Sequence, residues 1–157
     1  MDPQPVRLTS VQMTELVLPQ HTNQLGNLLG GQLMHWIDIC AALCGYKLNG
    51  KVCVTASVDK IDFHSPIKLG DVVNLQATVN RVFSSSMEVG VKVYAESYRE
   101  NRVVHSNSAY LTFVCVDENV RPVESRKVFP ESAEEERRFK QALDRREYRL
   151  QQRDKTY

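Results

Sequence analysis

The sequence predicts an α+β fold in which one long helix packs against a five-stranded antiparallel sheet. Three observations support this: a helical apolar pattern from about residue 28 to 48, four later segments of alternating apolar residues, and short turns between those segments. Alternation with a period of two is typical of strands, and apolar residues on nearly all sides of a helix indicate that it is buried. Short turns favour antiparallel pairing of successive strands.

A strand and a loop precede the long helix. Residues 11–19 alternate as a strand and end at Pro19. Residues 21–32 are rich in asparagine and glycine, which is typical of loops. After the helix, the letters NGK at 49–51 indicate a turn into the next strand.

The remaining strands are expected at 52–63, 72–83, 87–98 and 103–116. In the first of them the apolar positions shift from even to odd numbers, which indicates a bulge or bend. The last has apolar residues on both faces. A strand buried on both sides predicts a helix against one face and something else, such as a partner subunit, against the other.

The end of the chain differs in composition. We expect a single domain over residues 1–125 and a charged helical tail over 126–157. Ser132 and Glu135 have the spacing of a capping box at the start of that helix. Residues 131–155 carry seven acids and eight bases, which indicates a solvated helix rather than a basic binding arm.

Composition excludes several classes of function. The chain has 157 residues, of which 42% are hydrophobic and 25% charged, with a formal net charge of +1. Nothing in this balance indicates a nucleic-acid or membrane partner. There is no run of 18 apolar residues and no apolar signal core near the start, so we expect a cytoplasmic protein.

Four cysteines are present: Cys40, Cys44, Cys53 and Cys115. Their spacing fits no zinc pattern, although Cys40 and Cys44 share a helix face. We expect buried thiols in a reducing compartment and no metal site.

Asp38 is the most unusual residue of the long helix, because it lies in the almost wholly apolar run MHWIDICAA. A buried carboxylate is costly unless it is paired, hydrogen-bonded or used. Gly31 precedes it by seven residues, nearly two helical turns, so both lie on one face. Gly30 and Gly31 stand where the helix begins and backbone N–H groups are unpaired. An anion cradle and a carboxylate are what hydrolysis of an acyl compound requires.

Each of these residues also has a purely structural interpretation. Asp38 would then pair with a structural partner, and the two glycines would allow close packing of the helix. Asn23 would make an Asx turn in its loop. The residue pattern alone leaves these alternatives open.

Four stretches of the chain resemble the acyl-CoA thioesterases of the hotdog fold. They are HTNQLGNLLGGQLMHWID, CVTASVDKIDF, PIKLGDVV and VNRVFSSSMEVGVKV, in that order within residues 12–117. The resemblance is closest to the cytosolic and brown-fat acyl-CoA hydrolases and their small bacterial relatives. That family wraps a five-stranded antiparallel sheet round a long helix.

The resemblance implies a role for each matched residue. Asp38 falls on the family's catalytic acid, which activates water or attacks the thioester carbonyl. Asn23 falls on an asparagine that works beside that acid from the partner subunit. Gly30 and Gly31 fall where a backbone N–H polarises the thioester oxygen.

Coenzyme A binding and assembly are implied in the same way. Arg81 and the turn Ser84, Ser85, Ser86 and Met87 fall in the region that grips coenzyme A, which is part of the substrate, so no separate cofactor is expected. The animal relatives carry two hotdog units and this chain has one. The resemblance therefore implies a homodimer as the minimal unit, and a tetramer or hexamer beyond it.

Three other functions remain as alternatives. A hotdog hydratase or dehydratase would use a histidine such as His64, or His35 paired with Asp38. A non-catalytic acyl-CoA-binding protein would keep the fold without turnover. A scaffold working through the charged helix would leave the arrangement around Asp38 without a purpose.

Overall fold

The computed structural model describes residues 1–59 and 61–156. Its helices are α1 (Gly30–Asn49) and α2 (Ala133–Thr156), with short 3₁₀ helices at Val6–Thr9 and Pro19–His21. The main-sheet strands are β2 (Val11–Leu16), β3 (Cys53–Val58), β4 (Val72–Val82), β5 (Ser86–Ser97) and β6 (Arg102–Cys115). Two further strands, β1 (Gln4–Pro5) and β7 (Val128–Phe129), form a small parallel pair.

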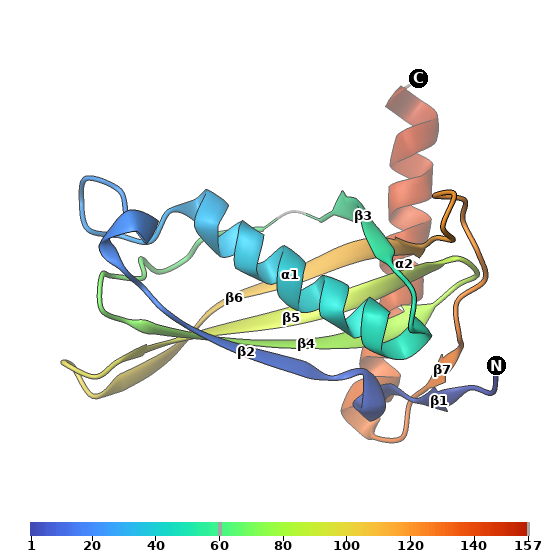
Figure 1. Cartoon of the computed structure of the whole chain (residues 1–157), viewed down its shortest axis with the longest axis horizontal. Coiled ribbons are helices and arrows are strands. Elements are labelled where there is room, and N and C mark those ends of the chain that lie inside the picture. Colours follow the sequence, from blue (N-terminus) through green and yellow to red (C-terminus); the bar gives the residue numbers. More distant parts are fainter. Residues whose placement is uncertain (60, 157) are drawn as a thin grey trace.

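The main sheet has five strands in the order β2-β4-β5-β6-β3, and all neighbours pair antiparallel. It curves around α1, which lies along one face (Figure 1). The α+β class, the single central helix and the order of the main strands are thus confirmed. Both β2 and β3 are edge strands of this sheet, and the position of β3 becomes important below.

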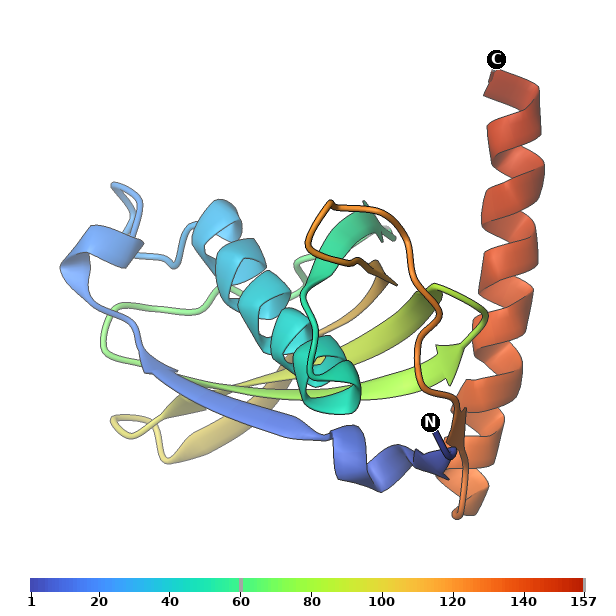
Figure 2. The same ribbon diagram turned by 45° about the vertical axis from the view of Figure 1, so that its right-hand side comes forward.

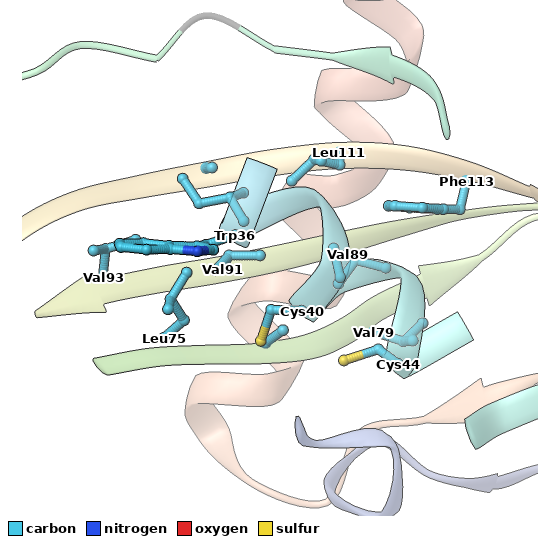
Figure 3. Close-up of a cluster of buried hydrophobic side chains, with 14 of the residues drawn as sticks. Trp36, Cys40, Cys44, Leu75, Val79, Val89, Val91, Val93, Leu111 and Phe113 are labelled. Atoms are coloured by element: carbon cyan, nitrogen blue, oxygen red, sulfur yellow. The ribbon is translucent and has the colours of Figure 1, made fainter. Parts of the chain in front are cut away.

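The core lies between α1 and the concave face of the sheet. Trp36, Cys40 and Cys44 project from the helix onto the valines and leucines of β4, β5 and β6 (Figure 3). All four cysteines are buried. Burial raises the pKa of the Cys40 thiol to about 11 and that of Cys44 to about 12. In the described part of the chain, no group of three or more histidine, cysteine and acidic residues could hold a metal ion.

The expected irregularity in β3 is present, but the strand is shorter than predicted. The register against β6 shifts between Thr55 and Ser57, and the strand ends at Val58 rather than near residue 63. The predicted stretch crosses Lys60, which lies outside the described residues. Residues 61–66 are not in a strand, so the change of parity reflects both the bulge and the end of the strand.

The tail helix α2 lies across the sheet on the side opposite α1 (Figure 2). The Arg145 guanidinium lies 3.8 Å from the ring centre of Tyr110, on the outer face of β6. The outer face of that strand is therefore covered in part by this chain's own helix, and a partner subunit is not needed to explain its apolar residues. The predicted capping box is present, because Ser132 and Glu135 each accept a hydrogen bond from the other's backbone N–H.

Glu88, near the start of β5, is a completely buried carboxylate. Both of its oxygens accept hydrogen bonds from Arg145 of α2, at 2.7 and 3.0 Å, and Asn80 donates another at 3.0 Å. Burial opposes the charge on Arg145, but the hydrogen bond and charge of Glu88 outweigh it and raise the pKa of Arg145. This ion pair fixes α2 to the sheet, while the domain boundary near residue 125 stays a prediction.

Replacing Glu88 by alanine should lower the free energy of unfolding by about 3 kcal/mol, because a buried ion pair loses one partner. The matched control is Glu134→Ala. Glu134 contacts Lys92, Arg137 and Arg138, but its side chain is 55% exposed, and surface ion pairs contribute only about 0–1 kcal/mol. Urea denaturation of both variants measures the difference. Equal losses would show that Glu88 does not hold α2.

Candidate active site

The start of α1 is an open helix N-terminus. Leu29 stands at the N-cap position, and no side chain caps the helix there. A Cβ added at Gly31 would meet no atom of the described residues within 4 Å, while one added at Gly30 would lie 3.4 Å from the Phe63 ring. The first N–H groups of a helix have no partner within it, and they carry the positive end of the helix dipole. This end of α1 can therefore bind an electron-rich oxygen.

A cavity of about 340 Å³ adjoins the same helix end. Its walls include Gly30, Leu33, Phe63 and Ile67, with Asn27 and Asn107 as polar members. A mainly apolar wall beside free backbone donors suits a ligand that has an apolar part next to a carbonyl.

Asp38 lies two turns further along α1, on the side that faces β3. Thr55 of β3 donates a hydrogen bond from Oγ1 to Asp38 Oδ1 at 2.6 Å. The side chain is half-buried and does not lie in the core, which corrects the expectation from its apolar sequence neighbours. Neither interpretation of Asp38 is excluded by this contact, since a threonine hydroxyl can serve a structural or a catalytic carboxylate.

Exposed apolar side chains occur on both elements that meet at Asp38, the helix α1 and the strand β3. On α1 they are Ile39, Leu43 and Tyr46, which are 38%, 43% and 58% exposed. On β3, Val58 is 42% exposed and shares the face of Thr55, whereas Val54, 39% exposed, pairs with Val114 and points to the outer face of the sheet. An apolar face of this size, next to an unpaired strand edge, is typical of a surface that another protein chain covers. A surface of this kind adjoins Asp38 in the single chain.

Asn23 lies in the loop that leads to α1 and is exposed. Its Oδ1 accepts hydrogen bonds from the backbone N–H groups of Leu25 and Asn27, at 2.9 and 3.1 Å. This is the Asx turn that the sequence left open as an alternative. No hydrogen bond from Nδ2 to another described residue is found, so the turn fixes the side chain and leaves its donor group available. Within one chain, Asn23 and Asp38 are not hydrogen-bonded to each other.

The two histidines considered for a dehydratase do not form a site in this structure. His35 and His64 are both exposed, and the hydrogen-bond partner found for Asp38 among the described residues is Thr55 rather than His35. Nothing in the geometry therefore favours the hydratase alternative.

The stretch expected to grip coenzyme A is divided between the two faces of the sheet. Arg81 points to the outer face, where its guanidinium lies 4.1 Å from the Phe139 ring centre and donates to the Phe139 carbonyl. Met87 is fully buried in the core, Ser84 and Ser85 lie in the turn between β4 and β5, and Ser86 begins β5. A role for this stretch in binding coenzyme A stays a prediction.

Thr55 is the residue at this site that the sequence did not reveal. It lies seventeen residues after Asp38, and a threonine in an alternating strand is too common to attract attention. The position of its strand beside the helix becomes apparent only in three dimensions.

Comparisons of the sequence and of the structure with known proteins both identify the same family. The thioesterase superfamily profile matches residues 25–101. Acyl-coenzyme A thioesterase 11 of Mus musculus is 44% identical over 90% of this chain, and the chain spans about a quarter of the length of that relative. Shorter relatives are covered more completely. The uncharacterized acyl-CoA thioester hydrolase YkhA of Bacillus subtilis is 39% identical over 81% of this chain and 74% of its own length.

Solved structures agree closely with this fold. An apo-hexameric acyl-CoA thioesterase is 35% identical with a TM-score of 0.92, and 97% of each chain is covered. An acyl-CoA hydrolase from Staphylococcus aureus, in complex with butyryl coenzyme A and coenzyme A, is 34% identical with a TM-score of 0.87, covering 98% of this chain and 96% of its own.

Alanine variants of the S. aureus hydrolase replace an asparagine, an aspartate and a threonine. Those three positions are separated by fifteen and seventeen residues. Asn23, Asp38 and Thr55 have the same separations in this chain. In the described residues, no helix has the length and apolar character needed to cross a membrane.

Proposed function

Because the chain belongs to the acyl-CoA thioesterases of the hotdog fold, within the thioesterase superfamily, we propose that it hydrolyses an acyl-CoA to a carboxylic acid and coenzyme A. The observation that carries the proposal is the geometry of α1. One helix presents an uncapped N-terminus at Gly30 and Gly31 and a hydrogen-bonded carboxylate at Asp38 on a face that a second chain can cover.

The chemistry follows from these groups. Backbone N–H groups at the start of α1 stabilise the negative charge that develops on the thioester oxygen. Asp38 either removes a proton from water as the water attacks the carbonyl carbon, or attacks that carbon itself. In both routes the carbon–sulfur bond breaks, the thiolate of coenzyme A takes up a proton, and water supplies the oxygen of the new acid. Thr55 orients the carboxylate through its hydrogen bond.

The geometry of α1 supports a site built from two copies of the chain. Gly31 and Asp38 are seven residues apart, which separates them by about 10 Å along the axis of α1. One carbonyl group is too small to contact both at once. We therefore assign the helix start and Asn23 of one copy, and Asp38 and Thr55 of the other, to the same site. Asn23 belongs with the helix start because its loop leads directly into α1.

In this proposal the edge strand β3 forms the interface between the two copies. An unpaired edge with exposed valines is a template for another strand, and a twofold axis across it would continue the sheet into a second copy. The same axis places the two α1 helices side by side and antiparallel, and it covers Ile39, Leu43 and Tyr46. Such dimers would further assemble into larger rings, and two of the similar solved structures are described as hexameric.

A panel of substrates from acetyl- to palmitoyl-CoA tests the proposal, with free thiol followed by Ellman's reagent. We expect thiol release with at least one chain length, and the buried cysteines of the protein should add little background. The cavity beside Gly30 would hold the acyl group, so the panel also reports its capacity. Binding of acyl-CoA without thiol release at any chain length would instead identify an acyl-CoA-binding protein without turnover.

A further inference from the structure

Much of the C-terminal half of α2 is exposed, although Arg145 and Arg149 hold it to Glu88 and Asp59. It extends past the β3 edge of the sheet, with its end clear of every other element in both views (Figures 1 and 2). Tyr148 and Leu150 on this part of the helix are 62% and 36% exposed. Exposed apolar side chains on a helix that extends past the edge of its own domain are typical of a surface that a partner covers.

A groove of about 580 Å³ lies between this half of α2 and the outer face of the sheet. Ala56 and Ser57 of β3, Phe83, and Arg146 and Leu150 of α2 are among its lining residues. Ala56 and Ser57 lie in the middle of β3, which spans only Cys53–Val58. The groove is therefore open at the centre of the strand edge to which a second copy would add its own β3.

We propose that the C-terminal half of α2 packs antiparallel against the same helix of a second copy, across the outer side of the β3 edge and centred on Leu150. This rests on the dimer of the proposed function. The proposed chemistry does not involve α2, and this contact gives the helix a role in assembly. The two copies of the groove would merge on the twofold axis, and each would be filled by side chains of the partner's helix.

The charges around Leu150 match this arrangement. In an antiparallel pair centred on Leu150, residues whose numbers lie equally far on either side face each other. Arg146 would then face the partner's Asp154, and Glu147 would face the partner's Arg153. All four side chains lie three or four residues from Leu150, so they flank it on one face.

None of these four residues forms an ion pair with the residues that the structure describes within its own chain. Their neighbours differ in this respect, because Arg145 and Arg149 are committed to Glu88 and Asp59. The twofold arrangement therefore pairs these four charges with opposite sign, whereas Lys155 would face the partner's Arg145, whose charge is already neutralised by Glu88.

An anion is the other conceivable occupant, since arginines line the groove. Three features make it the weaker choice. Arg149 already binds two carboxylates, and the Arg146 guanidinium lies 4.6 Å from the Phe83 ring centre. The groove is next to the C-terminal end of a helix, where the dipole repels anions. An anion would also leave Tyr148 and Leu150 uncovered.

Cysteine cross-linking tests the contact directly. In Leu150→Cys the two new thiols would face each other at the axis, and mild oxidation should convert most of the protein to a covalent dimer. The matched control is Asp144→Cys, also on α2 and exposed. Its two copies would be offset by twelve residues, or about 18 Å. That exceeds the ~7 Å Cα separation that a disulfide spans, so the control should stay unlinked. The four native cysteines are buried and do not compete.

Charge reversal tests the pairing. Arg153→Glu sets the new acid against the partner's Glu147 and should raise the dimer dissociation constant at least ~10-fold, as like charges do in an interface. Glu147→Arg should do the same. Combining both reversals restores opposite charges and should return the constant to near its original value. Arg137→Glu, on the part of α2 that covers its own sheet, is the control and should have little effect.

The outcomes separate this contact from the proposed function. An active dimer in which Leu150→Cys does not cross-link and Arg153→Glu does not weaken association would overturn the helix contact and leave the thioesterase assignment standing. If Arg153→Glu instead raises KM for acyl-CoA at unchanged turnover, the groove holds the phosphates of coenzyme A, and the proposal is wrong. An inactive monomer would contradict the proposed function itself.

Discussion

Asp38→Asn should lower the turnover number ~100-fold or more while the protein stays folded, because general acid–base catalysis typically contributes that much. Asparagine has nearly the shape of aspartate but can neither accept a proton from water nor attack a carbonyl. Its side-chain oxygen can still accept the hydrogen bond from Thr55, so the contact between α1 and β3 survives. The half-buried position of the side chain also makes the loss of charge easy to tolerate.

Thiol release and the melting temperature, measured on the same preparation, decide between the two interpretations of Asp38. A catalytic carboxylate loses turnover and keeps the fold, whereas a structural carboxylate loses stability and keeps turnover in the remaining folded protein. Asp144→Asn is the matched control, because it makes the same change at an exposed acid of α2, far from the proposed chemistry. A less stable Asp38→Asn protein with near-normal turnover would refute the mechanism.

The helices and strands could be predicted because they depend on the local spacing of apolar residues. The helix could be placed from residue 28 to 48 because its apolar residues recur at helical spacing, and α1 begins and ends within two residues of that range. The helix is capped by Gly50, which has the left-handed conformation with φ of 62°. This is the turn that the sequence NGK at 49–51 predicted. Strands β4, β5 and β6 alternate over ten residues or more, so a shift of one residue would turn every apolar side chain outward.

Burial of individual acids could not be predicted, because it depends on what covers each face. Asp38 has apolar neighbours in sequence, but Ile39 and Leu43 beside it are exposed in the single chain. Glu88, by contrast, is completely buried. Its neighbours Met87 and Val89 point to the other side of β5, and it is buried by Arg145, which lies 57 residues further along the chain.

The site could be located but not assembled from the sequence. Gly31 and Asp38 were placed on one face of a helix correctly, since spacing within a helix is fixed. The same spacing keeps them about 10 Å apart, and the proposed function therefore takes them from two copies of the chain. Asn23 also has a local role in an Asx turn, which is as common in loops as any catalytic role.

Mixing two inactive variants should restore activity if each site combines residues from two copies. Asn23→Ala and Asp38→Asn should each be nearly inactive alone. When equal amounts are unfolded and refolded together, half of the dimers contain one chain of each kind. Every mixed dimer has one site that combines an intact Asn23 with the partner's intact Asp38, so about a quarter of wild-type turnover should return. The thiol-release assay before and after mixing measures it.

The control uses both substitutions in one chain, refolded with an equal amount of the unchanged chain. For sites shared between copies, every mixed dimer then lacks one required residue at each site, and only unchanged homodimers work, which leaves about a quarter of wild-type turnover. For sites contained within one copy, about half should remain, and mixing the two single variants should restore nothing. A shared site predicts more activity from the two mixed single variants than a self-contained site does, and less activity from the mixture with the double variant. Together the two experiments decide whether Asn23 acts with the Asp38 of its own chain or with that of its partner.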